Sequence, residues 1–311
     1  MIPSPSKKIF LPYLALGTGI LALSFSAMFV RWAEAPASIM GFYRMLFATL
    51  FLLPFFLHSR KGAKPIGRAI LWAPLLGGLM TAMDHFIWNT SLGLTNVATA
   101  TILNNTAPLW VGLVAWFIFK ERLKGQFWTG LALALAGAVA VMGNDMLRHS
   151  TLGWGDIVAL VSGLFYAGYM LVTQLGRERL NTLSYVWMTA ACSSLYLLII
   201  SQLQGLPLTG YSPRTYLIFL AAALFSQVGG YLCLVYALGH LPASVVSPTM
   251  IIQPVLTALL AIPLLGEALH PIQALGGLAV LLGIFLVHRS REEAGHGQSR
   301  MAAVDGIELS Q

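Results

Sequence analysis

The sequence predicts an all-α polytopic membrane protein whose ten transmembrane helices form two inverted five-helix repeats. Three observations support this prediction. First, 57% of the 311 residues are hydrophobic and only 9% are charged, whereas a soluble domain carries about 25% charged residues. Second, ten apolar runs are each close to the ~20 residues that a helix needs to cross the hydrocarbon layer. Third, the two halves of the chain repeat each other at a constant offset of 146 residues.

The first apolar run covers residues 9–30, directly after Lys7 and Lys8. The apolar core of a cleaved signal peptide is only about 7–15 residues long, so we interpret this longer run as a retained transmembrane helix. The other nine runs lie at 36–57, 69–92, 97–119, 126–143, 154–175, 183–204, 215–238, 243–265 and 271–288. Only short loops remain between the runs, so consecutive helices are expected to be antiparallel neighbours.

The basic residues are distributed unevenly between the two sides of the membrane. With ten spans, fourteen Lys and Arg residues fall on the side of both termini, and three fall on the other side, namely Arg31, Arg148 and Arg214. The positive-inside rule then places both termini in the cytoplasm. The membrane is expected to be the plasma membrane, the inner membrane of a bacterium. The net charge of +7 reflects this loop bias, so no nucleic-acid partner is expected. The polar tail, 292–311, is expected to be disordered.

No cofactor or metal site is predicted. Cys192 and Cys233 lie in separate apolar runs, which is typical of buried free thiols, and they have no metal-ligand spacing. The chain has no Gly-x-x-x-x-Gly-Lys-Ser/Thr loop that could hold ATP. Its function is therefore expected to require no ATPase partner.

The internal repeat aligns residues 91–142 with 237–288 without a gap. Its most specific matches are Pro108 with Pro254, Glu121 with Glu267, Gly130 with Gly276 and Gly137 with Gly283. Each unit holds five helices, an odd number, so the second unit must be upside down in the membrane. We expect the units to be 1–149 and 150–291. Inverted repeats are typical of secondary transporters, which bind their substrate near the midplane between the halves.

The charges in the two repeated loops agree with this inversion. The loop at Glu121 carries Lys120, Arg122 and Lys124, as a cytoplasmic loop should, whereas the loop at Glu267 carries no Lys or Arg. The two loops are therefore expected on opposite sides of the membrane.

These motifs resemble a known family. The pattern Ser91-Leu-x-x-Thr95-x-Val97-Ala, followed by Pro108, Lys120-Glu-Arg-Leu123, Gly130 and Gly137, resembles the EamA-type domain of the drug/metabolite transporter superfamily. The second copy, with Pro254, Gly266-Glu-Ala-Leu269, Gly276 and Gly283, is a weaker match that lacks basic residues beside Glu267. The resemblance covers roughly 10–288. It implies ten helices, a central cavity and transport of small metabolites, with export more typical than uptake, but it implies no single substrate.

Arg44 and Asp84 are the two charged residues well inside predicted spans. Such charges cost ~2.5–3.5 kcal/mol or more, so they should face the bundle interior. Both lie ~12 Å below the external ends of adjacent helices, which predicts a structural ion pair between them. The alternative is that Asp84 faces the cavity and binds a proton or a cationic group. EamA-type proteins often carry an Arg in the second helix, as Arg44 is here.

Further polar and aromatic residues near mid-depth are candidates for the cavity wall. Together with Asp84 they are His85, Trp88, Asn104, Asn105, Tyr166, Gln227, Tyr231 and Gln253. Their mixture of rings and polar groups would suit an amphipathic ligand. The alternative for each one is packing between helices. His85 titrates near neutrality and could relay protons, but a lone intramembrane His can equally be a hydrogen-bonded packing residue.

Pro108 and Pro254 occupy equivalent places in the two repeats. A proline inside a helix removes a backbone hydrogen bond, and the freed carbonyl is tolerated where it lines a cavity. The two prolines are therefore predicted to kink their helices and act as gating hinges. Simple packing kinks are the alternative.

The sequence thus predicts a secondary transporter that moves small organic metabolites, amino-acid-like or amphipathic, by alternating access. Its expected partners are the small-molecule substrate, membrane lipid and, as a candidate coupling ion, the proton. Proton exchange, other exchange and facilitation remain open as energy sources. An intramembrane enzyme, for which no catalytic cluster is visible, and a non-transporting structural or receptor protein are the alternatives.

Overall fold

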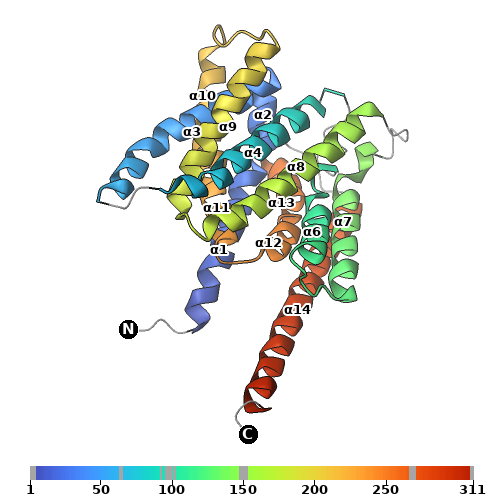
Figure 1. The fold of residues 1–311 in the computed structure, drawn as a ribbon. Helices are drawn as coiled ribbons and strands as arrows, with labels where there is room; N and C mark the ends of the chain where they lie inside the picture. Colours follow the sequence, from blue (N-terminus) through green and yellow to red (C-terminus); the bar gives the residue numbers. More distant parts are fainter. Residues whose placement is uncertain are drawn as a thin grey trace.

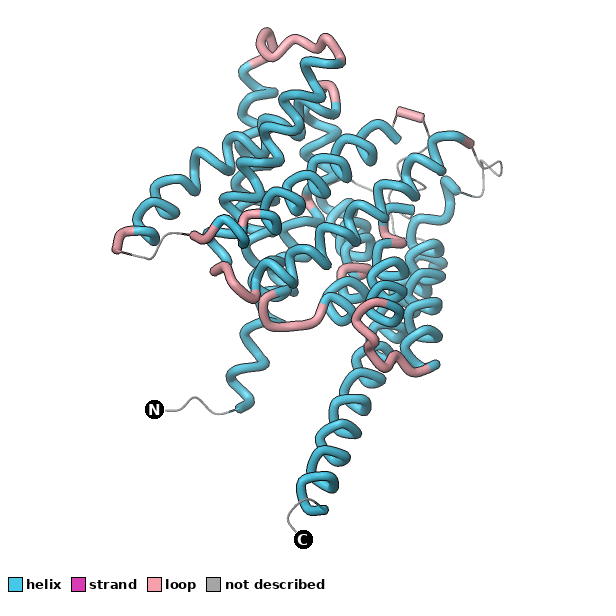
Figure 2. The backbone as a smooth tube through the Cα atoms, in the orientation of Figure 1, coloured by secondary structure: helices cyan, strands magenta, loops and turns pink. Residues whose placement is uncertain are grey.

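The computed structural model describes the backbone of residues 5–62, 66–91, 93–94, 100, 103–146, 153–265 and 271–308. Its described elements are helices, without a strand in these ranges, and they gather into one bundle from which α14 extends (Figures 1 and 2). The helices are α1 (Pro5–Ser24), α2 (Ser26–Ala33), α3 (Ala37–Arg60), α4 (Trp72–Ser91), α6 (Ala107–Phe117), α7 (Gly125–Met146), α8 (Trp154–Arg177), α9 (Thr182–Leu203), α10 (Pro213–Ala222), α11 (Tyr231–Leu238), α12 (Ala243–Thr249), α13 (Ile252–Leu265) and α14 (Pro271–Glu308). A 3₁₀ turn, η1 (Arg68–Ile70), precedes α4, and a π-helix, η2 (Ala223–Gly230), joins α10 to α11.

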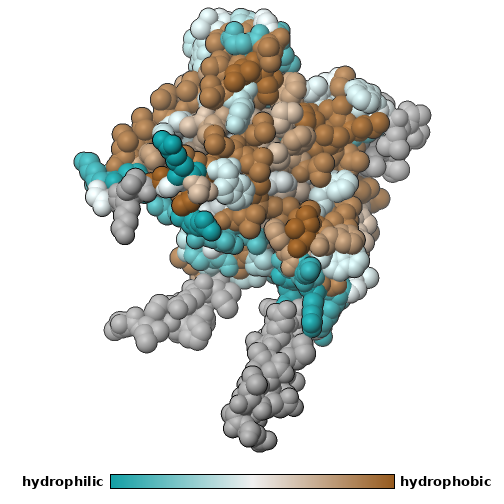
Figure 3. All heavy atoms as spheres, in the orientation of Figure 1, coloured by the Kyte–Doolittle hydropathy of each residue, from teal (hydrophilic) through white to brown (hydrophobic). Residues whose placement is uncertain are grey.

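Each predicted apolar run coincides with helix in the described residues. Within the part of the chain that the structure describes, seven helical segments are long and apolar enough to cross a membrane. They cover the first three predicted runs, the sixth to eighth, and the tenth. The other three runs contain the shorter apolar helices Ala107–Phe117, Gly125–Val141 and Ala243–Leu256. An all-helical membrane fold is therefore confirmed, while the count of ten spans stays a prediction. Hydrophobic side chains cover most of the visible surface, and hydrophilic ones gather along its lower edge, at the left and at the top (Figure 3).

Local sequence signals explain where several helices begin and end. The Asn181 side chain accepts a hydrogen bond from the backbone N–H of Ser184 and so caps α9. Ser212 caps α10 in the same way, with Pro213 at the first helical position. Glu34 has a left-handed backbone conformation that ends α2.

The chain after Arg291 differs from the expectation of a disordered tail. The described backbone of α14 continues as helix to Glu308, and residues 309–311 lie outside the described range. The tail is polar, but it contains many good helix formers, including Glu, Gln, Arg and Ala. Such residues continue a helix readily once a preceding segment has nucleated it.

Two pairs of repeated glycines bring α7 and α14 into backbone contact. Gly130 packs against Gly283, and Gly137 packs against Gly276, where a Cβ atom would lie 2.6 Å from the Gly276 carbonyl oxygen. These pairs require the two helices to be antiparallel, and they lie side by side in Figure 1. Because α7 and α14 are equivalent in the sequence repeat, equivalent helices of the two halves run in opposite directions where they meet.

Other helix contacts occur in matched sets under the same equivalence. α4 of the first half packs on α8 of the second half, and the equivalent segments η2 and α11 of the second half pack on α1 of the first. Likewise α6 packs on α8 while α13 packs on α1, and α3 packs on its own equivalent, α9. The bundle core is therefore built from contacts between the halves, and a cavity between them is bounded by both.

Candidate functional site

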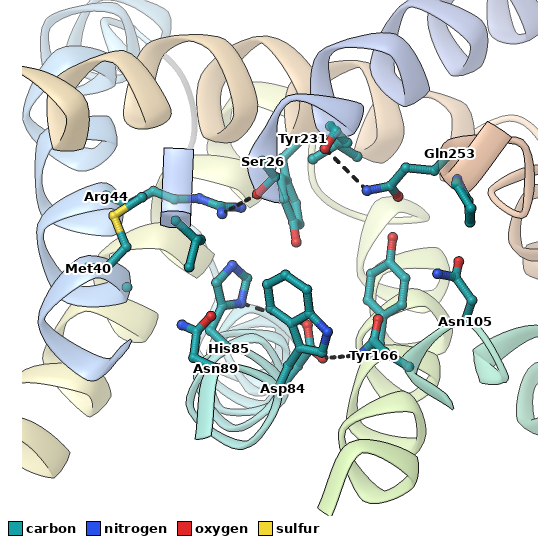
Figure 4. A pocket seen from close by; sticks show the side chains of 16 residues that line it. Ser26, Met40, Arg44, Asp84, His85, Asn89, Asn105, Tyr166, Tyr231 and Gln253 are labelled. Carbon is teal, nitrogen blue, oxygen red and sulfur yellow. Dashed lines mark hydrogen bonds and ion pairs between the residues drawn. The ribbon is translucent and has the colours of Figure 1, made fainter. Parts of the chain in front are cut away.

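A cavity of about 130 Å³ lies between the two halves of the bundle (Figure 4). Residues from α1, α2, α3, α4, α8, α11, α13 and the segment 103–106 contribute to its wall. The lining residues are Leu23, Ser26, Val30, Met40, Gly41, Arg44, Asp84, His85, Trp88, Asn89, Asn104, Asn105, Tyr166, Tyr231, Gln253 and Pro254. Both charge-bearing groups of the sequence prediction are thus brought to one site.

Eight of the nine residues predicted for the cavity wall line this cavity, namely Asp84, His85, Trp88, Asn104, Asn105, Tyr166, Tyr231 and Gln253. The ninth, Gln227, supports the wall from behind. Its Oε1 accepts hydrogen bonds from Nε and Nη2 of Arg44, at 3.2 Å and 3.1 Å. The sequence prediction did not include six of the lining residues, namely Leu23, Ser26, Val30, Met40, Gly41 and Asn89. Of these, only Asn89 carried a usable signal, because it follows His85 by one helical turn.

Arg44 is held by contacts to three other helical segments, α2, η2 and α11. Its side chain is 4% exposed. Nη1 donates to Oγ of Ser26 at 2.8 Å, and the guanidinium carbon lies 5.8 Å from the centre of the Tyr231 ring. Gln227 reaches it from η2, a π-helical segment; such segments alter the direction of side chains and are frequent at functional sites. The guanidinium group of Arg44 is therefore held in place at the cavity wall by these side chains.

Asp84 has a different set of partners. Its Oδ1 accepts a hydrogen bond from Nδ2 of Asn104 at 2.9 Å, and its Oδ2 lies 3.8 Å from Nδ1 of His85. His85 Nδ1 also lies 2.8 Å from the carbonyl oxygen of Thr81. Since that carbonyl can only accept, Nδ1 carries a proton, and in a neutral imidazole Nε2 is left as an acceptor. The pair offers a carboxylate and an imidazole on one helical turn.

Arg44 and Asp84 do not make the predicted direct ion pair in this conformation. Among the described residues, the guanidinium contacts Ser26 and Gln227, and the carboxylate contacts Asn104 and His85. Equal depth on neighbouring helices brings two side chains to one layer but does not fix their directions. The two groups enter the cavity from different sides (Figure 4), so the cavity wall carries a separated cation and carboxylate.

Two polar atoms in the cavity wall are buried without a hydrogen-bond partner in the described structure. They are Nε1 of Trp88, a donor, and Oδ1 of Asn89, an acceptor. The other amide atom of Asn89, Nδ2, donates to the carbonyl of Ala37 at 3.1 Å, which fixes the orientation of the amide. A buried polar atom without a partner is costly, by about 1–3 kcal/mol. A ligand in the cavity could satisfy both atoms.

Pro108 and Pro254 do not kink continuous helices, which corrects the expectation from sequence. Pro108 is the second residue of α6, after a turn at Asn105 and Thr106. Pro254 is the third residue of α13, after a turn at 250–251. The N–H groups of a first helical turn have no intrahelical acceptor, so proline is tolerated there. Each proline therefore starts a helix after a break, and both breaks border the cavity.

The described residues contain no cluster of three or more His, Cys, Asp or Glu side chains that could hold a metal ion. Cys192 and Cys233 are free thiols.

Comparison with known protein families assigns the chain to one of them. The sequence profile of the EamA-like transporter family matches residues 11–143 and again 153–289. The chain belongs to the EamA-like transporter family. This membership confirms the resemblance seen in the sequence motifs, and it accounts for the two structural repeats.

Relatives of this EamA-like protein are also described as transporters. An uncharacterised transporter of Archaeoglobus fulgidus is 27% identical over 280 residues, covering 88% of this chain and 95% of the relative. An uncharacterised inner membrane transporter of Escherichia coli is 26% identical and covers 81% of each chain. A shorter match, 28% identical over 102 residues and covering 33% of this chain and 34% of the relative, is to an S-adenosylmethionine uptake transporter of Rickettsia prowazekii.

A solved structure has the same fold as this EamA-like protein. It superposes with a TM-score of 0.72 over 89% of this chain and 96% of the other, at 17% identity. Together with the apolar helices and the transporter relatives, the family membership identifies an integral membrane transporter.

Proposed function

We propose that this EamA-like transporter moves small amphipathic, amino-acid-like metabolites through the central cavity by alternating access. One observation carries the proposal: the cavity wall holds a buried cation, Arg44, and a buried carboxylate, Asp84, that are not paired with each other. A zwitterionic ligand has the complementary pair of charges. It would offset the electrostatic cost of both groups at membrane depth.

Each end of such a ligand has a matching group. A guanidinium recognises a carboxylate through parallel N–H donors, and the Asp84 carboxylate is suited to an ammonium group. Trp88 Nε1 and Asn89 Oδ1 would supply one further donor and one acceptor. The rings of Tyr166 and Tyr231 leave apolar surface for the rest of the molecule.

The helix breaks reinforce this preference for a carboxylate. Asn105, in the turn just before α6, and Pro254, in the first turn of α13, line the cavity. A helix N-terminus carries unpaired N–H groups and a partial positive charge. Discontinuous helices of other transporters present this end to anionic substrate groups.

The inverted arrangement supports alternating access. The antiparallel contact between α7 and α14 is the arrangement that an inversion of the second half would produce. We propose ten spans with both termini in the cytoplasm of a bacterial inner membrane, and breaks at Pro108 and Pro254 that open and close in turn. A reporter fused after Arg291 should therefore read as cytoplasmic, and an external reading would contradict both the orientation and the span count.

The proposal also covers the direction of transport and its energy source. We propose export, on the resemblance to exporters of this superfamily, and proton coupling through Asp84 and His85, whose side chains are in contact. Both are open to direct measurement in the experiment below.

Transport into proteoliposomes tests the function. We expect amino acids with apolar side chains to accumulate, while analogues that lack either the carboxylate or the amino group move more slowly. Arg44→Gln should abolish the preference for a carboxylate, and Asp84→Asn should abolish the preference for an amino group. Arg122→Gln, which removes an exposed charge that does not line the cavity, is the matched control. A pH gradient applied in either direction tests proton coupling. If no amphipathic compound moves faster than through protein-free vesicles, the proposal is wrong.

A further inference from the structure

A second cavity, of about 170 Å³, lies where α3 ends and α9 begins. A water molecule needs only ~10–15 Å³ of such space, so this cavity could hold a polyatomic ion. It shares no lining residue with the central cavity. Its wall comes from both halves, because Arg60 and Gly67 flank the α3–η1 connection while Arg179 and Asn181 flank the α8–α9 connection.

The side chains of this wall favour an anion. Arg60 is half-buried at the last position of α3, and Arg179 is exposed in the loop after α8. No carboxylate lines the cavity among the described residues. A guanidinium forms bidentate hydrogen bonds with the oxygens of a phosphate group. Two guanidinium groups at one small cavity therefore select for a doubly coordinated oxyanion.

Ser184 supplies an independent sign of a ligand. Its side chain is 1% exposed, lines the cavity, and has an Oγ without a hydrogen-bond partner in the described structure. Its backbone N–H is already satisfied by Oδ1 of Asn181 at 2.8 Å. The hydroxyl is therefore the unused group, and a buried hydroxyl in a polar cavity calls for a partner.

The start of α9 adds further donors. This helix has 22 residues, and the N–H groups of its first turn have no intrahelical acceptors. The partial positive charge at the helix start acts in the same direction as the two guanidinium groups. Ser184, the start of α9 and the two arginines therefore border the same cavity.

We propose that this cavity binds a phosphate-type oxyanion, either the headgroup of an anionic phospholipid or a free phosphate. Its position fits a headgroup, because basic pockets between the cytoplasmic ends of membrane helices bind acidic lipids. Hydrophilic side chains gather around the end of α3 at the left of Figure 3. A bound anion would contact both the α3–η1 connection of the first half and the α8–α9 connection of the second half. It would therefore stabilise the contact between the two halves.

Thermal unfolding of the purified full-length protein in an uncharged detergent tests the proposal. Three additions are compared at equal ionic strength: inorganic phosphate, short-chain phosphatidylglycerol, and short-chain phosphatidylcholine as the neutral lipid. We expect phosphatidylglycerol to raise Tm in a saturable way and phosphatidylcholine to leave it unchanged. Arg60→Gln should weaken the apparent Kd about tenfold, because it removes a charge-assisted contact in a half-buried place. Arg179→Gln, at an exposed residue, should weaken it about threefold.

Control variants separate this site from general charge effects. Arg122→Gln removes an exposed charge outside the cavity and should keep the wild-type Kd. Ser184→Ala should weaken the Kd without a change of net charge. If Arg60→Gln does not fold, the Ser184 and Arg179 variants carry the test alone.

The outcomes distinguish the sources of the anion. A saturable response to phosphatidylglycerol that the cavity variants weaken supports a lipid headgroup. A response to inorganic phosphate that the same variants weaken supports a free oxyanion. No saturable response to either addition, or a response that is equal in the cavity variants and in Arg122→Gln, would overturn the proposal.

Discussion

Asn104 fixes the carboxylate of Asp84 through a 2.9 Å hydrogen bond from Nδ2 to Oδ1. The same Nδ2 lies 2.9 Å from Oγ of Ser162, which belongs to α8 in the second half. Asp84 is therefore tied to the opposite half through an amide, while Arg44 is left to other partners. Both charged groups line the cavity, and Asn104 links one of them to the second half.

Replacing Asn104 with Ala should impair both stability and transport. The change removes a hydrogen bond to a buried carboxylate, so the free energy of unfolding should fall by about 1.5–3 kcal/mol. Transport should fall as well, because Asp84 loses its orientation. Thr129→Ala is the control, since Thr129 is exposed and bonds only within its own helix, to the carbonyl of Gln126. Equal stability in the Asn104 and Thr129 variants would contradict this role.

Exchanging the two charges should not restore function. Arg44→Asp and Asp84→Arg should each abolish transport. The double variant should remain inactive, because Ser26, Gln227 and Asn104 are arranged for the original positions. Thermal unfolding and transport of the three variants check this expectation. Rescue close to wild type in the double variant would mean that Arg44 and Asp84 pair directly during the transport cycle.

Enlarging Gly137 should disrupt the contact between α7 and α14. A Cβ there would lie 2.6 Å from the carbonyl oxygen of Gly276 and from the backbone N of Val280. Neither backbone atom can move without displacing its helix. Gly137→Val should therefore lower the free energy of unfolding by about 3 kcal/mol or more. The control is Gly17→Ala in α1, where a Cβ would meet nothing within 4 Å. This substitution should stabilise the helix by about 0.5–1 kcal/mol. A well-folded Gly137→Val protein would show that this contact is looser than described.

Replacing Pro108 or Pro254 with Ala should slow transport. Either change restores an N–H group that can bond the carbonyl four residues earlier, so a continuous helix can replace the break. We expect each variant to fold and bind substrate but to transport several times more slowly. Because the prolines lie in oppositely directed halves, cysteine labelling from the two sides should shift in opposite directions. Unchanged transport and labelling in both variants would mean that the prolines only start their helices.

Hydropathy was sufficient to locate the helices. Every predicted run contains a helix, because backbone groups in lipid must bond within their own segment. The runs could not reveal interruptions at Phe25 or at Asn105, because an apolar sequence is compatible with both a continuous and a broken helix.

Most of the residues that line the cavity could be predicted from the sequence for a related reason. Polar groups at membrane depth are costly unless they face the interior, so Asp84, Asn104 and Gln253 were found from sequence. Their partners were not predictable. That Arg44 contacts Gln227 depends on a π-helical segment and on side-chain directions across a helix interface. Neither leaves a periodic pattern in the sequence.

The glycine contacts of α7 and α14 have a consequence for the ancestry of the chain. Gly130 meets Gly283, and the equivalent residues, Gly276 and Gly137, meet in the same way. Each contact between two residues is thus repeated between their equivalents in the other half. An interface with this property is isologous, as in a two-fold homodimer. The seam would be self-complementary even if the two halves were separate, identical chains inserted in opposite orientations. A single gene for a dual-topology dimer could therefore have supplied this interface before duplication and fusion joined the copies.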